Sequence, residues 1–212
     1  MTRGCFITLE GGEGAGKTVQ TAGLCAALEA HGVGTLATRE PGGSPGAEEI
    51  RKLLVSGPAE RWDPLAEAML HAAARRDHLQ HTIEPALARG LWVVSDRFVD
   101  SMMVYQGHGQ GADLAVMERL SQLSLDGFAP DLTIVLDIAA AEGLGRAGAR
   151  AGSNRYERMG ADFHERVREG FLARAQAEPE RFAVVDAAAD PETVGRAIFA
   201  VVAARLPVPS DG

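Results

Sequence analysis

Residues 11–18 read Gly-Gly-Glu-Gly-Ala-Gly-Lys-Thr, a complete match to the pattern G-x-x-x-x-G-K-[ST]. The apolar run Cys5–Leu9 precedes the match, and the helix-forming stretch Val19–Glu29 follows it. In such a loop, successive backbone N–H groups turn inward at the positive end of a helix dipole and bind phosphate oxygens. Lys17 can then reach the β- and γ-phosphates of a nucleotide, and Thr18 can place a hydroxyl on Mg²⁺. The alternative is a glycine-rich turn before an ordinary helix, but the strand–loop–helix setting favours phosphate binding.

The composition indicates one folded unit whose main partner is not a nucleic acid. A chain of 212 residues suffices for one large domain and buries roughly 70% of its unfolded surface without a disulfide or a metal. The formal net charge of −8 argues against a nucleic-acid surface, so clustered arginines become informative. We expect one domain over residues 1–206 and a flexible tail over residues 207–212.

The sequence carries no pattern typical of an exported or membrane protein. The N-terminus runs directly into the strand that carries the phosphate loop, so we expect no cleaved secretory signal. No stretch approaches the length of about 18 apolar residues that indicates a membrane span. Cys5 and Cys25 are interpreted as two reduced thiols rather than as a bridge. The prediction is a cytoplasmic protein that contacts neither membrane nor nucleic acid.

Short apolar runs alternate with helical patterns along the chain, which predicts the α/β architecture of a P-loop NTPase, with a five-stranded parallel sheet flanked by helices on both faces. The predicted strands are Cys5–Leu9, Val33–Thr38, Leu91–Ser95, Leu132–Asp137 and Phe182–Asp186. The predicted helices are Lys17–His31, Gly46–Ser56, Asp63–Gly90 with a kink or break at Pro85, Val99–Gln106, Leu114–Leu125, Ala140–Ala151, Ala161–Gln176 and Pro191–Arg205. Ligands of such a sheet lie at the carboxyl ends of its strands.

Two charged residues, Asp96 and Arg97, follow the third predicted strand. A carboxylate at the tip of a buried strand near the phosphate loop is well placed to hold Mg²⁺, directly or through water. Its alternative role is the N-cap of the next helix. Arg97 can bind a phosphate bidentately, or it can form an ordinary surface ion pair. The adjacent pair favours a metal and phosphate site.

The loop after the second strand reads Arg-Glu-Pro-Gly-Gly-Ser over residues 39–44. Proline followed by two glycines predicts a tight loop at the carboxyl end of a strand, where a second substrate would lie. A plain turn is the alternative.

Arginines gather in the segment Arg146–Arg158, which also carries Arg150 and Arg155 between small, loosening residues. This pattern predicts a lid over about residues 146–160 that closes over phosphates and excludes water. The alternative is a solvated helix face paired with Glu142 and Glu157. Arginine rather than lysine throughout favours the lid.

Three histidines, His71, His78 and His81, lie on one predicted helix. No cysteine or carboxylate completes a metal site with them, so His78 and His81 are interpreted as partly exposed helix residues. Arg75 lies one turn after His71 and shares its face.

Taken together, these motifs resemble the thymidylate kinase family from about Cys5 to Ala204. The segments that carry the resemblance are Leu9–Thr18, Thr38–Gly43, Pro85–Leu87, Trp92–Phe98, Tyr105–Gly107 and Pro130–Leu132. The phosphate loop alone would indicate only an NTPase, whereas the other segments in this order are far more specific. The resemblance implies transfer of the γ-phosphoryl group of ATP to dTMP, giving dTDP and ADP, in dTTP biosynthesis.

The resemblance also assigns roles by position. The expected ATP-binding residues are Gly11, Gly12, Glu13, Gly14, Ala15, Gly16, Lys17 and Thr18. The expected catalytic residues are Lys17, Asp96, Arg146 and Arg150, and Thr18, Asp96 and Glu157 would hold Mg²⁺. The expected dTMP-binding residues are Glu13 at the 3′-hydroxyl, Arg97 at the phosphate, Tyr105 at the 2′ position, Arg75, Gln106 and His71 at the base, and Arg39. The Glu40–Pro41 bond is expected to be cis, as is usual at this family position.

Two positions matter for the family branch and for the base. Some members carry a catalytic arginine in the phosphate loop and others in the lid; Gly14 at the loop position makes this chain resemble the lid-arginine branch. Arg146 and Arg150 are the two alternatives for contact with the γ-phosphate. His71 stands where the family usually has phenylalanine stacked on thymine, so unusual base affinity or pH dependence is expected. Met102 replaces a commonly small or polar residue.

Three competing functions agree less well with the sequence. A kinase for another nucleoside monophosphate is the nearest, but Arg75, Tyr105 and Gln106 favour thymine. A GTP-dependent switch would carry an Asn-Lys-x-Asp motif, which the chain lacks. A non-catalytic nucleotide-binding module would be expected to lack Lys17, Asp96 or the arginine lid. The resemblance further suggests a homodimer through helices that flank the sheet.

Overall fold

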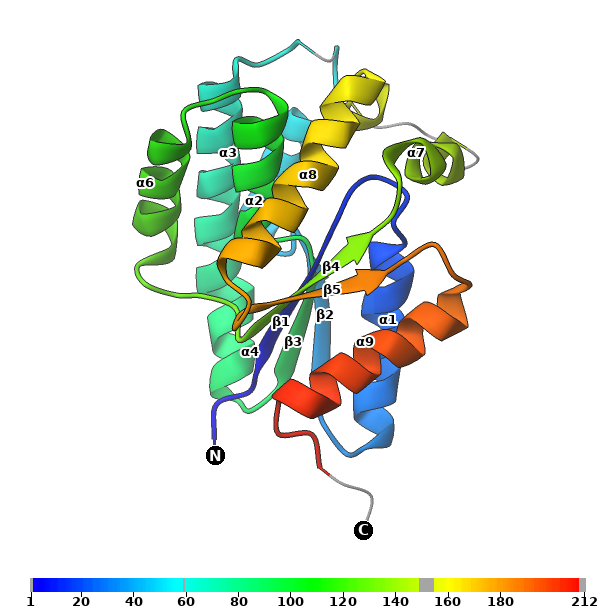
Figure 1. The fold of residues 1–212 in the computed structure, drawn as a ribbon. Helices are drawn as coiled ribbons and strands as arrows, with labels where there is room; N and C mark the ends of the chain where they lie inside the picture. The colour runs from blue at the N-terminus through cyan, green and yellow to red at the C-terminus, as the bar shows by residue number, and fades with distance from the viewer. Residues whose placement is uncertain (1, 59, 149–154, 210–212) are drawn as a thin grey trace.

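Five parallel strands form the centre of the fold (Figure 1). In the computed structural model, which describes residues 2–58, 60–148 and 155–209, the strands are β1 (Phe6–Glu10), β2 (Thr35–Arg39), β3 (Trp92–Asp96), β4 (Leu132–Asp137) and β5 (Phe182–Asp186). Their order across the sheet is β2-β3-β1-β4-β5, and each neighbouring pair is parallel. The predicted α/β class and five-stranded parallel sheet are confirmed.

Helices cover both faces of this sheet (Figure 1). One face carries α1 (Lys17–Ala30) and α9 (Pro191–Arg205). The helices on the other side or at the ends of the strands are α2 (Pro45–Val55), α3 (Pro64–His78), α4 (Glu84–Ala88), α5 (Val99–Met102), α6 (Leu114–Leu125), α7 (Ala140–Gly148) and α8 (Ala161–Ala177). Two π-helical segments, Leu79–Ile83 and Met103–Gly109, and a 3-10 turn, Tyr156–Arg158, lie between them.

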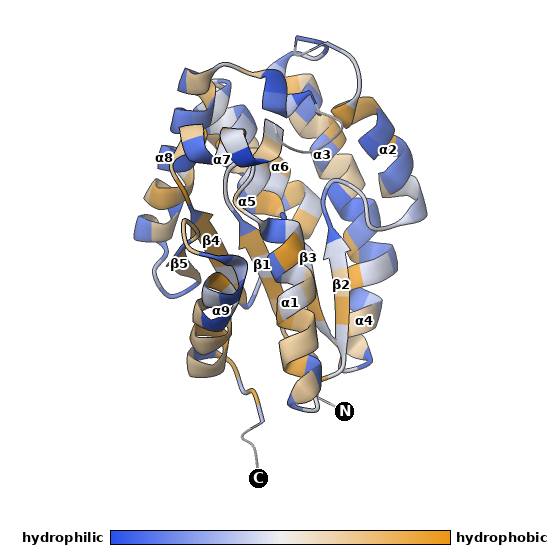
Figure 2. Cartoon of the chain, turned by 90° about the vertical axis from the view of Figure 1, so that its right-hand side faces the viewer, coloured by the Kyte–Doolittle hydropathy of each residue, from blue (hydrophilic) through white to orange (hydrophobic). Residues whose placement is uncertain are grey.

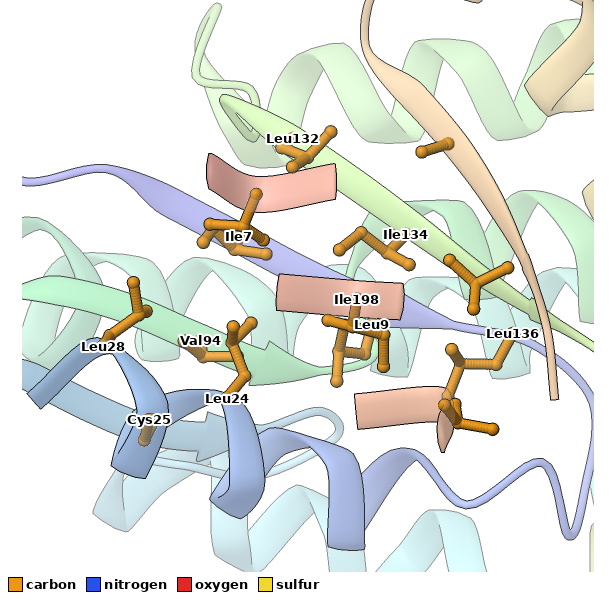
Figure 3. Close-up of a cluster of buried hydrophobic side chains, with 14 of the residues drawn as sticks. Ile7, Leu9, Leu24, Cys25, Leu28, Val94, Leu132, Ile134, Leu136 and Ile198 are labelled. Atoms are coloured by element: carbon orange, nitrogen blue, oxygen red, sulfur yellow. The ribbon is translucent and has the colours of Figure 1, made fainter. Parts of the chain in front are cut away.

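Apolar side chains from both faces of the sheet make the core. On the α1–α9 face, Leu24 and Ile198 pack against Ile7, Leu9 and other strand residues (Figure 3). On the opposite face, separate clusters join the strands to α4, α8 and the two π-helical segments. Coloured by hydropathy, β1 and β4 are largely orange (Figure 2), because both faces of each strand are covered.

The strand register brings charged residues to one edge of the sheet. Arg39, at the end of β2, lies opposite Asp96, at the end of β3. Leu9 of β1 also lies opposite Asp96, so the phosphate loop that follows β1 starts beside that carboxylate. This is the edge at which an open parallel sheet binds ligands.

The helix predicted over Asp63–Gly90 is interrupted in the structure. α3 begins at Pro64, with Asp63 as its N-cap accepting hydrogen bonds from two backbone N–H groups. The π-helical segment Leu79–Ile83 separates α3 from α4, and Pro85 lies in the first turn of α4, where its missing N–H costs little. The single helix expected over Val99–Gln106 is likewise divided into α5 and a π-helical segment.

The described part of the chain extends to residue 209, beyond the end of α9. Residues 210–212 lie outside the described part, but Val208 packs against the core cluster that α9 helps to form. Within the described ranges, no helix has both the length and the apolar character needed to cross a bilayer.

Candidate active site

The phosphate loop between β1 and α1 adopts a conformation that requires glycine at three positions, one of them Gly16 with a φ of 89°. Gly11 and Gly14 have φ values of 136° and 71°, a region that other residues rarely adopt. A Cβ atom on Gly14 would lie 1.9 Å from the backbone oxygen of Gly143, so α7 packs directly on the loop. Any side chain at position 14 would therefore require the backbone of α7 to move.

Lys17 folds back over the loop that it follows. Its Nζ donates hydrogen bonds to the carbonyl oxygens of Gly12 at 2.6 Å and Gly11 at 3.1 Å. Burial, and secondarily the guanidinium of Arg97, lowers the pKa of Lys17 to about 8. The ammonium therefore lies in the loop, held by carbonyl groups.

Asp96 and Thr18 meet at the mouth of the loop. The Thr18 hydroxyl donates a 2.6 Å hydrogen bond to Oδ2 of Asp96. The N-cap alternative for Asp96 is wrong, because α5 starts at Val99 and its N-cap position is Phe98. Two oxygen donors thus lie side by side at the end of β3, next to the start of α1.

Arg97 turns its guanidinium into the molecule rather than onto the surface. It donates to the Gly11 carbonyl at 3.1 Å, to the Ser101 hydroxyl at 3.2 Å, and to Glu13 and the Tyr105 hydroxyl at 2.9 Å each. Only 15% of its side chain is exposed. Burial alone would lower the pKa of Arg97, but these acidic neighbours raise it above its usual value. The surface ion-pair alternative is therefore wrong.

Glu13 lies on the other side of this guanidinium. Its carboxylate accepts hydrogen bonds from Arg97 and from the Tyr105 hydroxyl. Burial would raise the pKa of Glu13, but Arg97 and Lys17 together lower it below its usual value. The group is an anion at neutral pH, and it ties the phosphate loop to the residues after β3.

A cavity of about 280 Å³ opens in front of these residues. Most of the residues expected from the sequence line it, namely Glu13, Gly14, Gly16, Lys17, Thr18, Arg39, His71, Asp96, Arg97, Tyr105, Gln106 and Glu157. Four basic side chains, Lys17, Arg39, Arg51 and Arg97, gather there in a chain of net charge −8. The cavity is suited to anionic ligands.

The loop after β2 forms one wall of this cavity. Glu40 and Pro41 both line it, and the bond between them is cis, as expected. The Glu40 carboxylate is buried, where it accepts hydrogen bonds from Arg75 at 2.9 Å and His78 at 3.2 Å. The plain-turn alternative does not describe a loop that is tied to α3 in this way.

Arg75 and His78 lie deeper than the sequence suggests. Arg75 is 1% exposed; besides its bond to Glu40 it donates to the Phe98 carbonyl at 3.3 Å, and it stands behind the residues that line the cavity. The prediction of a partly exposed His78 is wrong, because this ring is completely buried between Glu40 and the Thr38 hydroxyl. Both side chains support the loop after β2.

His71, Tyr105, Gln106 and Tyr156 also line the cavity, and Tyr105 connects this group to Glu13 of the phosphate loop. His71 Nε2 lies 2.9 Å from the Tyr156 hydroxyl, and the rings of Tyr105 and Tyr156 meet edge to face. Gln106 donates to Glu67 at 2.6 Å, which leaves its buried Oε1 without a partner. An unpaired carbonyl oxygen in a cavity wall favours a ligand that carries an N–H or O–H donor.

The described arginines of the expected lid contact different parts of the fold. Arg146 donates to the carbonyl oxygens of Ala187 and Ala188 after β5, and it does not line the cavity. Arg155 is completely buried and forms an ion pair with Glu67 of α3. Arg150 lies outside the described residues.

Three polar residues that line the cavity, Arg51, Ser101 and Tyr156, were not predicted from the sequence. Arg51 of α2 donates to the Pro41 carbonyl at 2.6 Å, Ser101 bonds to Arg97, and Tyr156 bonds to His71. Ser101 follows Arg97 closely in the chain, so a contact between the two could have been considered from the sequence. Arg51 and Tyr156 reach the cavity only through the tertiary packing of α2 and of the 3-10 turn Tyr156–Arg158, which local sequence pattern does not reveal.

Comparisons with known proteins agree with this geometry. The thymidylate kinase family model matches residues 9–198. A thymidylate kinase of Caulobacter vibrioides is 51% identical over 206 residues, 97% of this chain and 99% of the relative. The chain belongs to the thymidylate kinase family. It is therefore a nucleoside monophosphate kinase, a phosphotransferase that uses ATP as the phosphate donor.

Two further members of the thymidylate kinase family extend the comparison. A thymidylate kinase of Jannaschia sp. is 48% identical over 202 residues, 95% of this chain and 97% of the relative. The crystal structure of thymidylate kinase from Ehrlichia chaffeensis superposes with a TM-score of 0.77 at 33% identity, covering 94% of this chain and 99% of that one. The fold is therefore that of the family.

The histidine at position 71 gives a prediction about acid stability. Burial and, next, the positive charge of Arg75 and Arg155 lower the pKa of His71 from 6.5 to about 3. Between those values the unfolded chain binds the extra proton, so the folded state loses stability as pH falls below about 6.5. We expect His71→Phe to reduce the loss of unfolding free energy between pH 7 and pH 5 by about 1–2 kcal/mol.

Urea unfolding at the two pH values measures this difference. His81→Phe is the matched control, because that ring is 58% exposed and pairs with Asp77, so its removal should not reduce the acid-induced loss. Equal losses in the His71→Phe variant and the unmodified protein would contradict a neutral His71 in the folded state.

Proposed function

We propose that the cavity is where the chain transfers the γ-phosphoryl group of ATP to dTMP, and that the site residues expected from the sequence carry this reaction. The observation that supports it most is the sharing of one cavity by the phosphate-loop lysine and the Asp96–Arg97 strand end. ATP would lie on the loop Gly11–Thr18, and dTMP would lie opposite, between Arg97 and His71. One chamber can then align both nucleotides for in-line transfer.

On the donor side, loop N–H groups and Lys17 would hold the triphosphate. Lys17 now bonds to two loop carbonyls, and it would exchange them for β- and γ-phosphate oxygens. Arg146 or Arg150 would add positive charge from the lid over residues 146–160. Because Arg146 now bonds to the chain after β5, it would have to leave those carbonyls to reach the γ-phosphate.

Mg²⁺ fits the donor set at the end of β3. The hydroxyl of Thr18 and the carboxylate of Asp96 are hard oxygen ligands 2.6 Å apart, and the carboxylate of Glu157 lines the same cavity. When bound there, Mg²⁺ would supply positive charge that offsets the negative charge of the triphosphate.

On the acceptor side, Arg97 would bind the phosphate of dTMP, and Arg39 and Arg51 would add positive charge. Glu13 would accept a hydrogen bond from the 3′-hydroxyl, and Tyr105, which is bonded to Glu13, would crowd the 2′ position. No side chain needs to act as a strong base, because a nucleotide phosphate is already an anionic nucleophile. Positioning and charge neutralisation therefore carry the reaction.

The base would lie against His71 and Gln106. The unpaired Oε1 of Gln106 would accept the ring N3–H of thymine, and the neutral ring of His71 would stack on it. Arg75, one layer behind, would bond to the base only after a shift of its side chain; in its present place it fixes Glu40. These groups favour thymine over a purine.

Binding experiments over a panel of nucleoside monophosphates test the proposal. In the presence of a non-hydrolysable ATP analogue, dTMP should raise the melting temperature more than dCMP, dGMP or dAMP at equal concentration, because only bound ligand stabilises the folded state. An equal or larger shift with another monophosphate would assign the cavity to a different acceptor.

We also propose that the chain acts as a homodimer in the cytoplasm, as one kinase domain over residues 1–206. Leu65 and Met69 lie one turn apart on α3 and are 40% and 51% exposed, which supports an apolar contact through that helix. Both cysteines are unpaired, as a reducing compartment favours. Sedimentation velocity should give the mass of two chains, and Met69→Lys should shift it toward one.

A further inference from the structure

The backbone at Arg97 is held in an unusual conformation. Its φ is +71°, in the left-handed region that residues other than glycine rarely adopt. Such a conformation persists only where its surroundings over-determine it, and functional sites are where it is commonly found. Here the residue in question carries the guanidinium expected to bind the acceptor phosphate.

Three hydrogen bonds hold the turn at Arg97 from its two sides. The Arg97 N–H donates to the Leu9 carbonyl at 2.9 Å, and the Ser95 hydroxyl donates to the Arg97 carbonyl at 2.7 Å. The next N–H, that of Phe98, donates to Oε1 of Glu10 at 2.8 Å. Of these partners, Glu10 is the only ionisable one, and it is completely buried.

Glu10 also reaches the side chain of Arg97. The Ser101 hydroxyl donates to Oε2 of Glu10 at 2.6 Å and accepts from Arg97 NH1 at 3.2 Å. The Ser101 N–H, at 3.3 Å, also donates to Oε1 of Glu10. One carboxylate thus holds both the backbone turn and, through one hydroxyl, the guanidinium.

The surroundings of Glu10 disfavour a charged carboxylate. Burial, and next the nearby carboxylate of Asp100, raises the pKa of Glu10 to about 7. The charged groups around it are Asp100, itself paired with Arg174 and Arg181, and Arg97 and Lys17 on the other side. The bonds that Glu10 accepts all come from the segment 98–101, so its contacts serve that turn.

We propose that Glu10 is a positioning residue that holds the left-handed turn at Arg97 and, through Ser101, aims the Arg97 guanidinium at the acceptor phosphate. The inference rests on the proposed function, because it takes Arg97 as the phosphate ligand of dTMP. Glu10 itself lies behind the turn and touches neither nucleotide.

Glu10→Gln tests this role, because it keeps the size of the side chain but replaces one acceptor by a donor. If the amide NH2 takes the place of Oε1, it faces the Phe98 N–H, which is also a donor. If it takes the place of Oε2, the Ser101 hydroxyl loses the oxygen to which it donates. We expect the KM for dTMP to rise about tenfold, with the KM for ATP unchanged within about twofold. Calorimetry should show the same loss of affinity for dTMP and no loss for thymidine, which lacks the phosphate.

A double-mutant cycle shows whether Glu10 acts through Arg97. In an Arg97→Ala background, Glu10→Gln should cause no further loss of dTMP affinity. Asp131→Asn is the matched control, because Asp131 accepts the Phe6 N–H at 2.6 Å at the opposite end of β1. It should lower the melting temperature without changing the KM for dTMP.

Equal losses for dTMP and thymidine, equal rises in both KM values, or additive effects of Glu10→Gln and Arg97→Ala would each overturn the proposal. If Glu10→Gln does not fold, Ser101→Ala replaces it and should give the same phosphate-specific loss to a smaller extent. Turnover of dTMP by the unmodified protein is measured first. Its absence would refute the proposed function, whereas its presence with an unaffected Glu10→Gln variant would refute only the role of Glu10.

Discussion

Lys17→Ala should abolish phosphoryl transfer while dTMP binding largely survives. The Lys17 ammonium is the one basic group that lies within the phosphate loop itself, held by the Gly11 and Gly12 carbonyls, and no other side chain there replaces its charge on the γ-phosphate. Removing a preorganised charge that acts on the transferring group costs about a thousandfold in kcat. A coupled assay for ADP gives kcat, and calorimetry gives the affinity for dTMP.

The other lysine of the chain provides the control. Lys52 lies on α2, where it is 68% exposed and pairs with Glu49, and Lys52→Ala should leave both values unchanged. A Lys17→Ala variant that still turned over at the rate of the unmodified protein would refute the assignment of the loop. Loss of dTMP binding together with turnover would place Lys17 on the acceptor side instead.

Asp96→Asn should lower kcat about a hundredfold and raise the Mg²⁺ concentration needed for half-maximal activity. Asparagine can keep the hydrogen bond from the Thr18 hydroxyl, which Oδ2 now accepts at 2.6 Å, so the local structure should persist. What it removes is the negative charge that would hold the metal at the end of β3. Titration of activity with MgCl₂ at saturating ATP and dTMP measures both effects.

Asp137→Asn is the corresponding control for position 96. Asp137 also ends a strand at this edge of the sheet, but it pairs with Arg168 of α8 and does not line the cavity. Its variant should retain the Mg²⁺ dependence of the unmodified protein. Unchanged Mg²⁺ dependence in Asp96→Asn would mean that the carboxylate acts on the protein rather than on a metal.

The architecture was predictable from sequence because its signals are local. Most strands are short apolar runs, since strands covered on both faces need apolar side chains throughout, whereas the edge strand β2 is only partly buried. Each predicted run matches an observed strand within about two residues. The interruptions at Leu79–Ile83 and Met103–Gly109 were not predicted. A π-helical turn differs from an α-helical turn by one residue in its hydrogen-bond spacing, and in segments this short that difference gives no clear signal in the apolar pattern. Only Pro85 indicates a break near the first of them.

Some residues of the candidate site were likewise predictable from local motifs, and others were not. The loop Gly11–Thr18 and the pair Asp96–Arg97 were predictable, because each motif places its own reactive groups. Burial of His78 against Glu40 was not, since the two residues are far apart in the chain and meet only when the loop after β2 packs on α3. Arg155 was expected in the lid, but it is buried against Glu67. These two residues are also far apart in the chain, so local pattern does not reveal their contact.

Transfer of the γ-phosphoryl group from ATP to dTMP can be measured directly in one assay. The purified chain is incubated with ATP labelled in the γ-phosphate, Mg²⁺ and dTMP, and the products are separated. We expect label in dTDP, with one ADP formed for each dTDP, and no transfer when dTMP is omitted. Label appearing in inorganic phosphate, or in another nucleoside monophosphate in preference to dTMP, would contradict it.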